Sequence, residues 1–284
     1  MTLLSCYITP HPPIVVPEVG GEEVAQVNAT YQALRTLGRR VALLEPDTIV
    51  VLSPHSPMAR FGMGVSLASS FRGSLVHFRA PQVRLEVAAD VQVARAINDD
   101  AVARGIPMAV TASPGTTMDL DHGAMVPLYF LTADLTRPYK LVLLSFSHLS
   151  LEEHVRFGRI IGRVLMASSA GIVYVASGDL SHRLCQGAPA GFDPRGADFD
   201  RAVTTFFAAG DWEALLSIEP GTVDAAGECG YRSLAVLSGI IETVTGAGDR
   251  TENHLLSYEG PFGVGYLVGE INIMNADPQT ESVP

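Results

Sequence analysis

The segment Thr48–Leu52 reads TIVVL and carries no charged side chain. A short, almost wholly apolar run of this kind is typical of a strand that is buried on both faces of a parallel sheet. Three further runs have the same character: Leu3–Ile8, Leu141–Phe146 (LVLLSF) and Gly171–Ser177 (GIVYVAS). We therefore expect four strands, spread over most of the chain, in one sheet.

Segments with the spacing of amphipathic helices separate these strands. One is Val24–Leu44, and further helices are expected at residues 86–104, 123–132, 151–166, 198–209, 212–217 and 231–245. Further strands are expected at residues 64–68 and 74–78 (a hairpin), at 108–111, and as a pair within 254–273. The alternation predicts an α/β fold, a single-domain αβα sandwich with a central mixed sheet and an active site at the carboxyl ends of its strands. The domain is expected over residues 1–275, followed by a flexible polar tail at 276–284.

The composition argues against several classes of protein. Of the 284 residues, 30 are acidic and 19 are basic, which gives a formal net charge of −11. A nucleic-acid binder, or a protein that docks on anionic lipid, needs clustered Lys and Arg instead. A long uncharged stretch, Val164–Gly178, is shorter than the ~20 apolar residues that cross a bilayer. Three scattered cysteines and first residues without a signal-peptide pattern lead us to expect a cytoplasmic protein with no membrane partner.

Several common catalytic signatures are missing from the sequence. It contains no G-x-x-x-x-G-K-[ST], no G-x-G-x-x-G after the first strand, no G-x-S-x-G, no C-x-x-C and no H-E-x-x-H. These absences argue against a P-loop enzyme, a lipase-like hydrolase and a zinc finger.

Histidines follow four of the expected strands. They are His11 (TPHPP), His55 (SPHS), His148 (SFSHLS) and His182 (GDLSH), and His122 (LDHGAMVP) follows a further strand and a Gly-containing loop. Loops at the carboxyl ends of the strands of an open α/β sheet meet at one crevice, where ligands bind. These imidazoles, far apart in the sequence, could therefore face one pocket.

Flanking prolines make His11 and His55 the strongest of these candidates. The prolines restrict the backbone and fix the side-chain direction, and a metal site needs preorganised imidazoles. His148 is ambiguous, because it also lies just before an expected helix. The remaining histidines are expected to be ordinary polar surface residues: His77, His154 and His254.

A carboxylate ligand is harder to identify from spacing. Asp119, Asp121, Asp179 and Glu228 lie near strand ends or glycine turns. Glu228 (AAGECGYRS) comes just before an expected helix, where a carboxylate commonly caps the N-terminus, or it could be a hard anionic ligand. The adjacent Cys229 is a softer alternative that would favour zinc or copper.

Taken together, these segments resemble the class III extradiol ring-cleavage dioxygenases, of the type of the protocatechuate 4,5-dioxygenase beta subunit. The matching segments are TPHPP, SPHS, LDHGAMVPL, GDLSHRL and the late segment that contains Glu228, and they occur in the family's order. LDHGAMVPL is the most specific of them and is also similar to DOPA dioxygenases. The Memo proteins share this outline without established dioxygenase chemistry, and the Cys229–Gly230 pair is similar to theirs.

The resemblance implies a role for each matched residue. His11 and His55 would be two ligands of a non-haem Fe(II), or else of zinc or another divalent metal, and Glu228 would be the third ligand. His182 would be the catalytic acid/base, and His122 would contact the substrate or the bound oxygen. A two-histidine, one-carboxylate triad leaves one face of the iron open for a catechol and O2, and imidazole suits proton transfer near neutral pH.

We therefore expect an aromatic ring-cleaving dioxygenase, an oxidoreductase that acts on a catechol or aminophenol in aromatic-compound catabolism. A Memo-like metal-binding protein without ring cleavage and a zinc-dependent hydrolase are the alternatives. Arg60, Arg183 and Arg232 lie near the site loops and could bind a substrate carboxylate, or be ordinary surface arginines. The expected partners are a small aromatic substrate, O2 and further copies of the chain, as a dimer or a higher oligomer.

Overall fold

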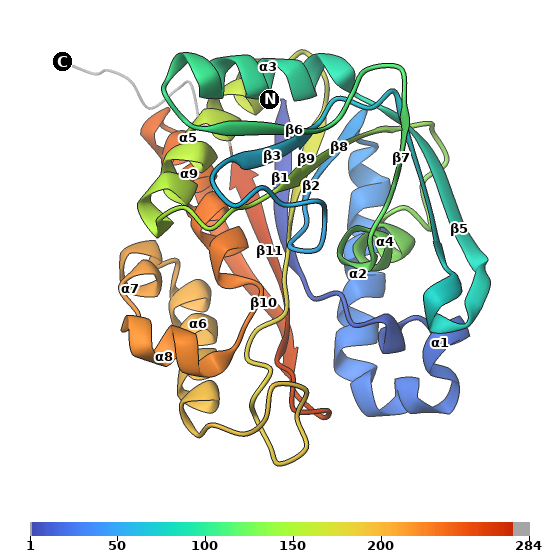
Figure 1. The fold of residues 1–284 in the computed structure, drawn as a ribbon, viewed down its shortest axis with the longest axis vertical. Helices are drawn as coiled ribbons and strands as arrows, with labels where there is room; N and C mark the ends of the chain where they lie inside the picture. Colours follow the sequence, from blue (N-terminus) through green and yellow to red (C-terminus); the bar gives the residue numbers. More distant parts are fainter. Residues whose placement is uncertain (1, 275–284) are drawn as a thin grey trace, which may run out of the picture.

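A mixed sheet of eleven strands runs through the part of the chain that the computed structural model describes, residues 2–274 (Figure 1). Its centre is formed by four parallel strands in the order β1 (Leu3–Thr9), β9 (Ile172–Ser177), β2 (Thr48–Leu52) and β8 (Lys140–Ser145). These are the four strands expected from the sequence, and every residue of β2 and β9 is buried. Beyond β1 the sheet continues antiparallel with β11 (Tyr266–Met274) and β10 (Arg250–Glu259), the expected C-terminal pair.

Within the described residues, five further strands form the other side of the sheet. β5 (Ala80–Ala89), β4 (Ser70–Leu75) and β7 (Thr117–Asp119) continue the order beyond β8. β3 (Met63–Ser66) pairs in parallel with β6 (Met108–Ala112) and antiparallel with β8. The combination of parallel and antiparallel pairs confirms the expected mixed sheet.

Helices cover both faces of this sheet, which Figure 1 shows nearly edge-on. α2 (Asn28–Leu44) and α4 (His122–Leu131) lie on one face, and α3 (Val91–Ala103), α5 (Leu151–Ala167) and α9 (Tyr231–Gly246) lie on the other. Alternate side chains of β2 divide the core in two: Ile49 and Val51 pack with α2 and α4, whereas Val50 and Leu52 pack with the other three helices. The expected single-domain αβα sandwich is confirmed.

Short helices fill the connections. η1 (Pro13–Val15), α1 (Pro17–Gly20) and η2 (Gly21–Val27) follow β1, and η3 (Val76–Phe78) follows β4. α6 (Arg195–Ala209), α7 (Trp212–Leu216) and α8 (Pro220–Ala226) lie between β9 and α9 in the chain.

Three expected elements differ from the structure. Residues 86–104 are not one helix but the end of β5 followed by α3. In β5 the exposed Arg84 and Glu86 alternate with more buried side chains, which is the pattern of a strand. Asp90 then caps α3. The expected hairpin at residues 64–68 and 74–78 is wrong: β3 pairs with β6 and β8, which buries its apolar side chains in the core. The helix expected at residues 24–44 begins at Asn28, after a 3-10 segment.

The expected tail at residues 276–284 lies outside the described residues. Within residues 2–274, no helix combines the length and the apolar character that crossing a bilayer requires.

Candidate metal centre

The carboxyl ends of the central strands bring distant segments of the chain together. The pairing register ends β1, β9 and β2 at the same level of the sheet. His11 follows β1, His55 follows β2 and Asp179 follows β9, while His122 is the first residue of α4. The order of the strands in the sheet therefore explains why residues so far apart in sequence share one site.

Three imidazoles form a compact group at this edge. One ring nitrogen from each of His11, His55 and His122 lies within 4.8 Å of the others. The His55 and His122 rings are stacked with their centroids 4.2 Å apart, and the His11 ring meets the His55 ring edge-on at 4.8 Å. His11 is buried, His122 is half-buried and His55 is exposed. This group could hold a metal ion.

The tautomer of His11 follows from its hydrogen bonds. Its Nδ1 lies 2.9 Å from Ser177 Oγ, and that hydroxyl donates its proton to the Gly123 carbonyl oxygen at 2.6 Å. The Ser177 oxygen must therefore accept from Nδ1–H, which leaves the His11 lone pair on Nε2. Burial of the ring, with the neighbouring imidazoles of His55 and His122, holds the pKa of His11 well below its ordinary value. His11 is thus neutral at pH 7, and its Nε2 is free to bind a cation.

The Nε2 atoms of His11 and His55 lie 3.0 Å apart. Two nitrogens bound at about 2.1 Å from one ion, at right angles to each other, are about 3 Å apart. A hydrogen bond on the other ring nitrogen, as His11 has, is also the usual arrangement of a metal-bound histidine. The donor atoms present therefore fit a divalent metal ion.

Asp121 connects the His55 loop to α4. Its carboxylate accepts hydrogen bonds from the hydroxyl groups of Ser53 at 2.6 Å and Ser56 at 2.5 Å, which flank His55. It also accepts from the amide of Ala124 and so caps α4. One partly buried network thus fixes the loop and the helix that carry two of the imidazoles.

Two further groups with ligand atoms face His11. Cys229 Sγ lies 3.7 Å from His11 Nε2, and Asp179 Oδ2 lies 3.9 Å from it. Asp179 Oδ1 accepts the His11 amide proton at 2.8 Å, and the Asp179 amide donates to Cys229 Sγ at 3.3 Å. Burial raises the pKa of the Asp179 carboxyl and of the Cys229 thiol. The His11 lone pair is therefore surrounded by an imidazole, a thiol and a carboxyl group.

Cys229 reaches the site because two glycines let their backbones meet. A Cβ atom on Gly178 would lie 2.2 Å from Gly230 Cα, and one on Gly230 would lie 2.9 Å from the Asp179 carbonyl oxygen. No side chain fits between these backbones. The loop after β9 and the start of α9 are therefore joined by a contact that only glycine allows.

Gly178→Ala is expected to lower the free energy of unfolding by about 1–3 kcal/mol, because the added methyl group forces the two backbones apart. Metal binding should weaken as well, since the shift carries Cys229 and Asp179 with it. Urea unfolding and zinc titration measure the two effects. Gly246→Ala is the matched control, because a Cβ there meets nothing within 4 Å. Equal behaviour of the two variants would contradict this role of Gly178.

Glu228 is not brought to the histidines. Its Oε2 accepts the amide proton of Tyr231, so the carboxylate caps α9, and its side chain lines a separate cavity with Arg232. The side chains of neighbouring residues point in different directions here, and Cys229 takes the direction toward His11. The sequence allowed Glu228 to be either a helix cap or a metal ligand, and in the structure it caps α9.

His182 lies at the same edge with a fixed tautomer. Its Nδ1 is 2.7 Å from the Gly227 carbonyl oxygen, which can only accept, so Nδ1 carries the proton and Nε2 the lone pair. Burial is the largest cause of the pKa shifts of His11 and Asp179, and a protonated His182 would lower both pKa values, so His182 lies within electrostatic range of the two groups. A free lone pair beside a metal position can accept a proton from a bound substrate.

The other histidines lie elsewhere. His148 is exposed, its amide donates to the Arg60 carbonyl, and it is not part of the three-histidine group. His154, expected on the surface, is fully buried, and burial lowers its pKa to about 4. His77 is exposed and His254 half-buried.

Comparisons with known proteins agree with this architecture. A family model described as the catalytic LigB subunit of aromatic ring-opening dioxygenase matches residues 5–269. Protein CA_C1420 of Clostridium acetobutylicum is 36% identical over 282 residues, which cover 98% of this chain and 59% of that protein. The chain thus spans somewhat more than half the length of this curated relative. The crystal structure of an uncharacterized protein, JW3007 from Escherichia coli K12, has a TM-score of 0.62 at 17% identity, over 94% of this chain and 99% of that one, which shows a shared fold.

Proposed function

Because the chain belongs to the family of the catalytic LigB subunits of aromatic ring-opening dioxygenases, we propose that it is a non-haem Fe(II)-dependent enzyme that cleaves a catechol or aminophenol ring with O2. The observation that carries this proposal is the pair of Nε2 atoms of His11 and His55, 3.0 Å apart. With the Asp179 carboxylate they make up two histidines and one carboxylate, the ligand types of non-haem iron oxygenases.

The residues around the metal position have distinct tasks in this reaction. When bound, Fe(II) would supply adjacent open positions at which the substrate hydroxyl groups and O2 are held together. His182 Nε2 takes the proton of a substrate hydroxyl and returns it as the ring opens. His122, stacked on His55, would donate a hydrogen bond to negative charge that develops beside the ligands.

A second candidate function is that of a Memo-like metal-binding protein without ring cleavage, and the position of Cys229 favours it. The sulfur lies 3.7 Å from His11 Nε2, slightly closer than the nearest Asp179 oxygen at 3.9 Å. A thiolate binds zinc or copper(I) better than a carboxylate does, and it is itself prone to oxidation beside O2. Two histidines and a cysteine would therefore suit a metal with a different task.

Three single variants separate these functions: Asp179→Asn, Cys229→Ser and Glu228→Gln. Each is measured for iron and zinc affinity under anaerobic conditions, and for O2 uptake with a panel of catechols. Ring cleavage predicts that Asp179→Asn loses at least about 100-fold in iron affinity, while Cys229→Ser keeps both iron and activity.

The second function predicts the reverse. Cys229→Ser would then lose the metal, and the wild type would take up no O2 with any catechol. Glu228→Gln should keep its metal under both functions, because its carboxylate caps α9. Loss of iron in this variant alone would restore Glu228 as the third ligand.

A further inference from the structure

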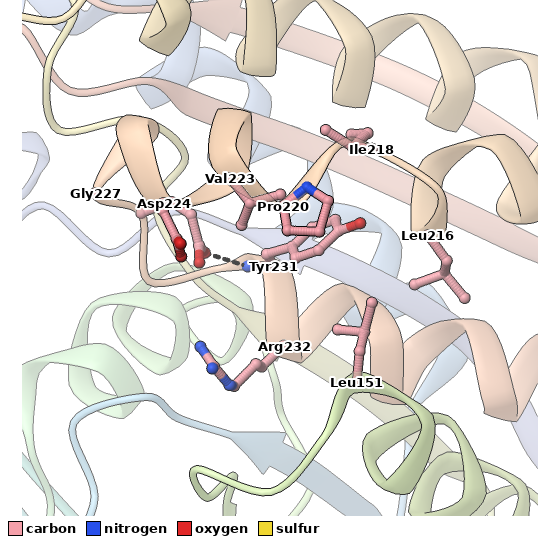
Figure 2. Close-up of a pocket in the computed structure, with 10 residues that line it drawn as sticks. Leu151, Leu216, Ile218, Pro220, Val223, Asp224, Gly227, Tyr231 and Arg232 are labelled. Atoms are coloured by element: carbon pink, nitrogen blue, oxygen red, sulfur yellow. Dashed lines mark hydrogen bonds between the residues drawn. The ribbon is translucent and has the colours of Figure 1, made fainter.

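Figure 2 shows a cavity whose lining residues include none of the candidate metal ligands His11, His55, Asp179 and Cys229. It has a volume of about 360 Å³ and lies between α7, α8, the amino end of α9 and the start of α5. None of the histidines, all of which are within the described residues, lines it. The two sites share a wall, because Gly227 lines the cavity while its carbonyl accepts the proton of His182. The volume lies in the range of small-molecule sites, about 300–1,000 Å³.

One end of this cavity is apolar. Figure 2 shows Leu216, Ile218 and Leu151 around that end, beside the ring of Tyr231. The Tyr231 hydroxyl donates to a backbone carbonyl at 2.9 Å, so the ring is held in place. A wall of this kind suits an aliphatic or aromatic group of a ligand.

Charged groups gather at the other end. Asp224 and Arg232 lie there in Figure 2, and the dashed line marks the bond by which Glu228 caps the Tyr231 amide. Burial raises the pKa of Glu228, while that amide and the Arg232 charge oppose the rise. Arg232 forms no ion pair with any residue from 2 to 274. Its guanidinium carbon lies 6.0 Å from the centroid of the Phe146 ring. This end therefore offers an unpaired cation next to two carboxyl groups.

We propose that the cavity binds an α-amino acid with an apolar side chain. The ligand carboxylate pairs with Arg232, its ammonium group with Glu228 and Asp224, and its side chain fills the apolar end. An apolar carboxylic acid would place its carboxylate near the carboxyl groups of Glu228 and Asp224 and has no ammonium group to pair with them. An apolar amine has no carboxylate and would leave Arg232 unpaired. Charge complementarity therefore favours the zwitterion over either singly charged ligand.

Calorimetric titration of the metal-free protein with L-leucine and L-phenylalanine tests this proposal. Binding of at least one of them is expected. The analogues of L-leucine that lack one charge are 4-methylpentanoate and 3-methylbutylamine. Each should bind at least about tenfold more weakly than L-leucine, because each loses a charge-assisted contact. The corresponding analogues of L-phenylalanine are 3-phenylpropionate and phenethylamine. Equal binding of an analogue would overturn the zwitterion, and no binding of either amino acid at millimolar concentration would overturn the site.

Two arginine variants locate the binding. Arg232→Met removes the cation and should weaken binding of the amino acid at least about tenfold. Arg84→Met, at an exposed position of β5, is the matched control and should leave the affinity unchanged. Thermal unfolding verifies that both variants fold. Unchanged affinity in Arg232→Met would contradict this cavity as the site. Because the titration uses metal-free protein, its result does not depend on ring cleavage.

Discussion

Replacing His11 by alanine is expected to abolish stoichiometric binding of a divalent metal, with a loss of affinity of at least about 100-fold. The site converges on His11 Nε2, with His55 Nε2 at 3.0 Å, Cys229 Sγ at 3.7 Å and Asp179 Oδ2 at 3.9 Å. Without this imidazole, the other ligand atoms lose the nitrogen that all of them face. Metal content after anaerobic loading with iron, and zinc titration against a competing chelator, measure the effect.

His55→Ala should give the same loss, since its Nε2 is the nearest partner of His11 Nε2. His77→Ala, an exposed position on η3, is the matched control and should bind metal like the wild type. Thermal unfolding in the presence of a chelator separates loss of a ligand from loss of the fold. Full metal content in both His11→Ala and His55→Ala would show that the ion binds elsewhere.

Replacing His182 by glutamine is expected to lower the turnover number by about 10²–10⁴-fold while the metal stays bound. The glutamine amide can still donate to the Gly227 carbonyl, so the loop keeps its anchor, but the basic lone pair of Nε2 is gone. The rate of O2 uptake with a catechol that the wild type cleaves, measured beside the iron content, gives both quantities.

The exposed His148 provides the control for this experiment, and His148→Gln should leave turnover unchanged. An unaltered rate in His182→Gln would remove His182 from the mechanism. Loss of iron in that variant would instead make His182 a metal ligand, as in a site richer in histidine.

The fold could be predicted from sequence where a local pattern matches the tertiary role. β2 and β9 are buried on both faces, so their apolar composition identifies them directly. β5 is half exposed, and its alternating pattern runs into the helical spacing of α3, which hides the boundary at Asp90. β7 and α8 were not expected because both are short, and β7 exists through its pairing with β4.

The site was predictable in part, namely where a local sequence pattern matches the position of a residue in the fold. His11 and His55 each follow a buried strand in a proline-bounded loop, and the structure brings both to one point. The directions of Glu228 and Cys229 depend on the contact between Gly178 and Gly230, and no spacing rule encodes a contact between distant segments.

The role of Asp121 had a partial signal in the sequence. A carboxylate just before a helix indicates a cap. Its bonds to Ser53 and Ser56, however, become visible only when the two loops are seen together.

The hydrogen bonds that orient His11 and the His55 loop are all made within the protein, so ions compete for a ready-made site. For such a site the general affinity order places copper and zinc above iron. The ion that the protein carries after aerobic purification then reports the composition of the growth medium and the buffers. The proposed iron enzyme would then retain its iron only where copper and zinc are scarce. For the proposed enzyme, the supply of free metal in the cell, together with the ligand types and the geometry of the site, would decide which ion is bound.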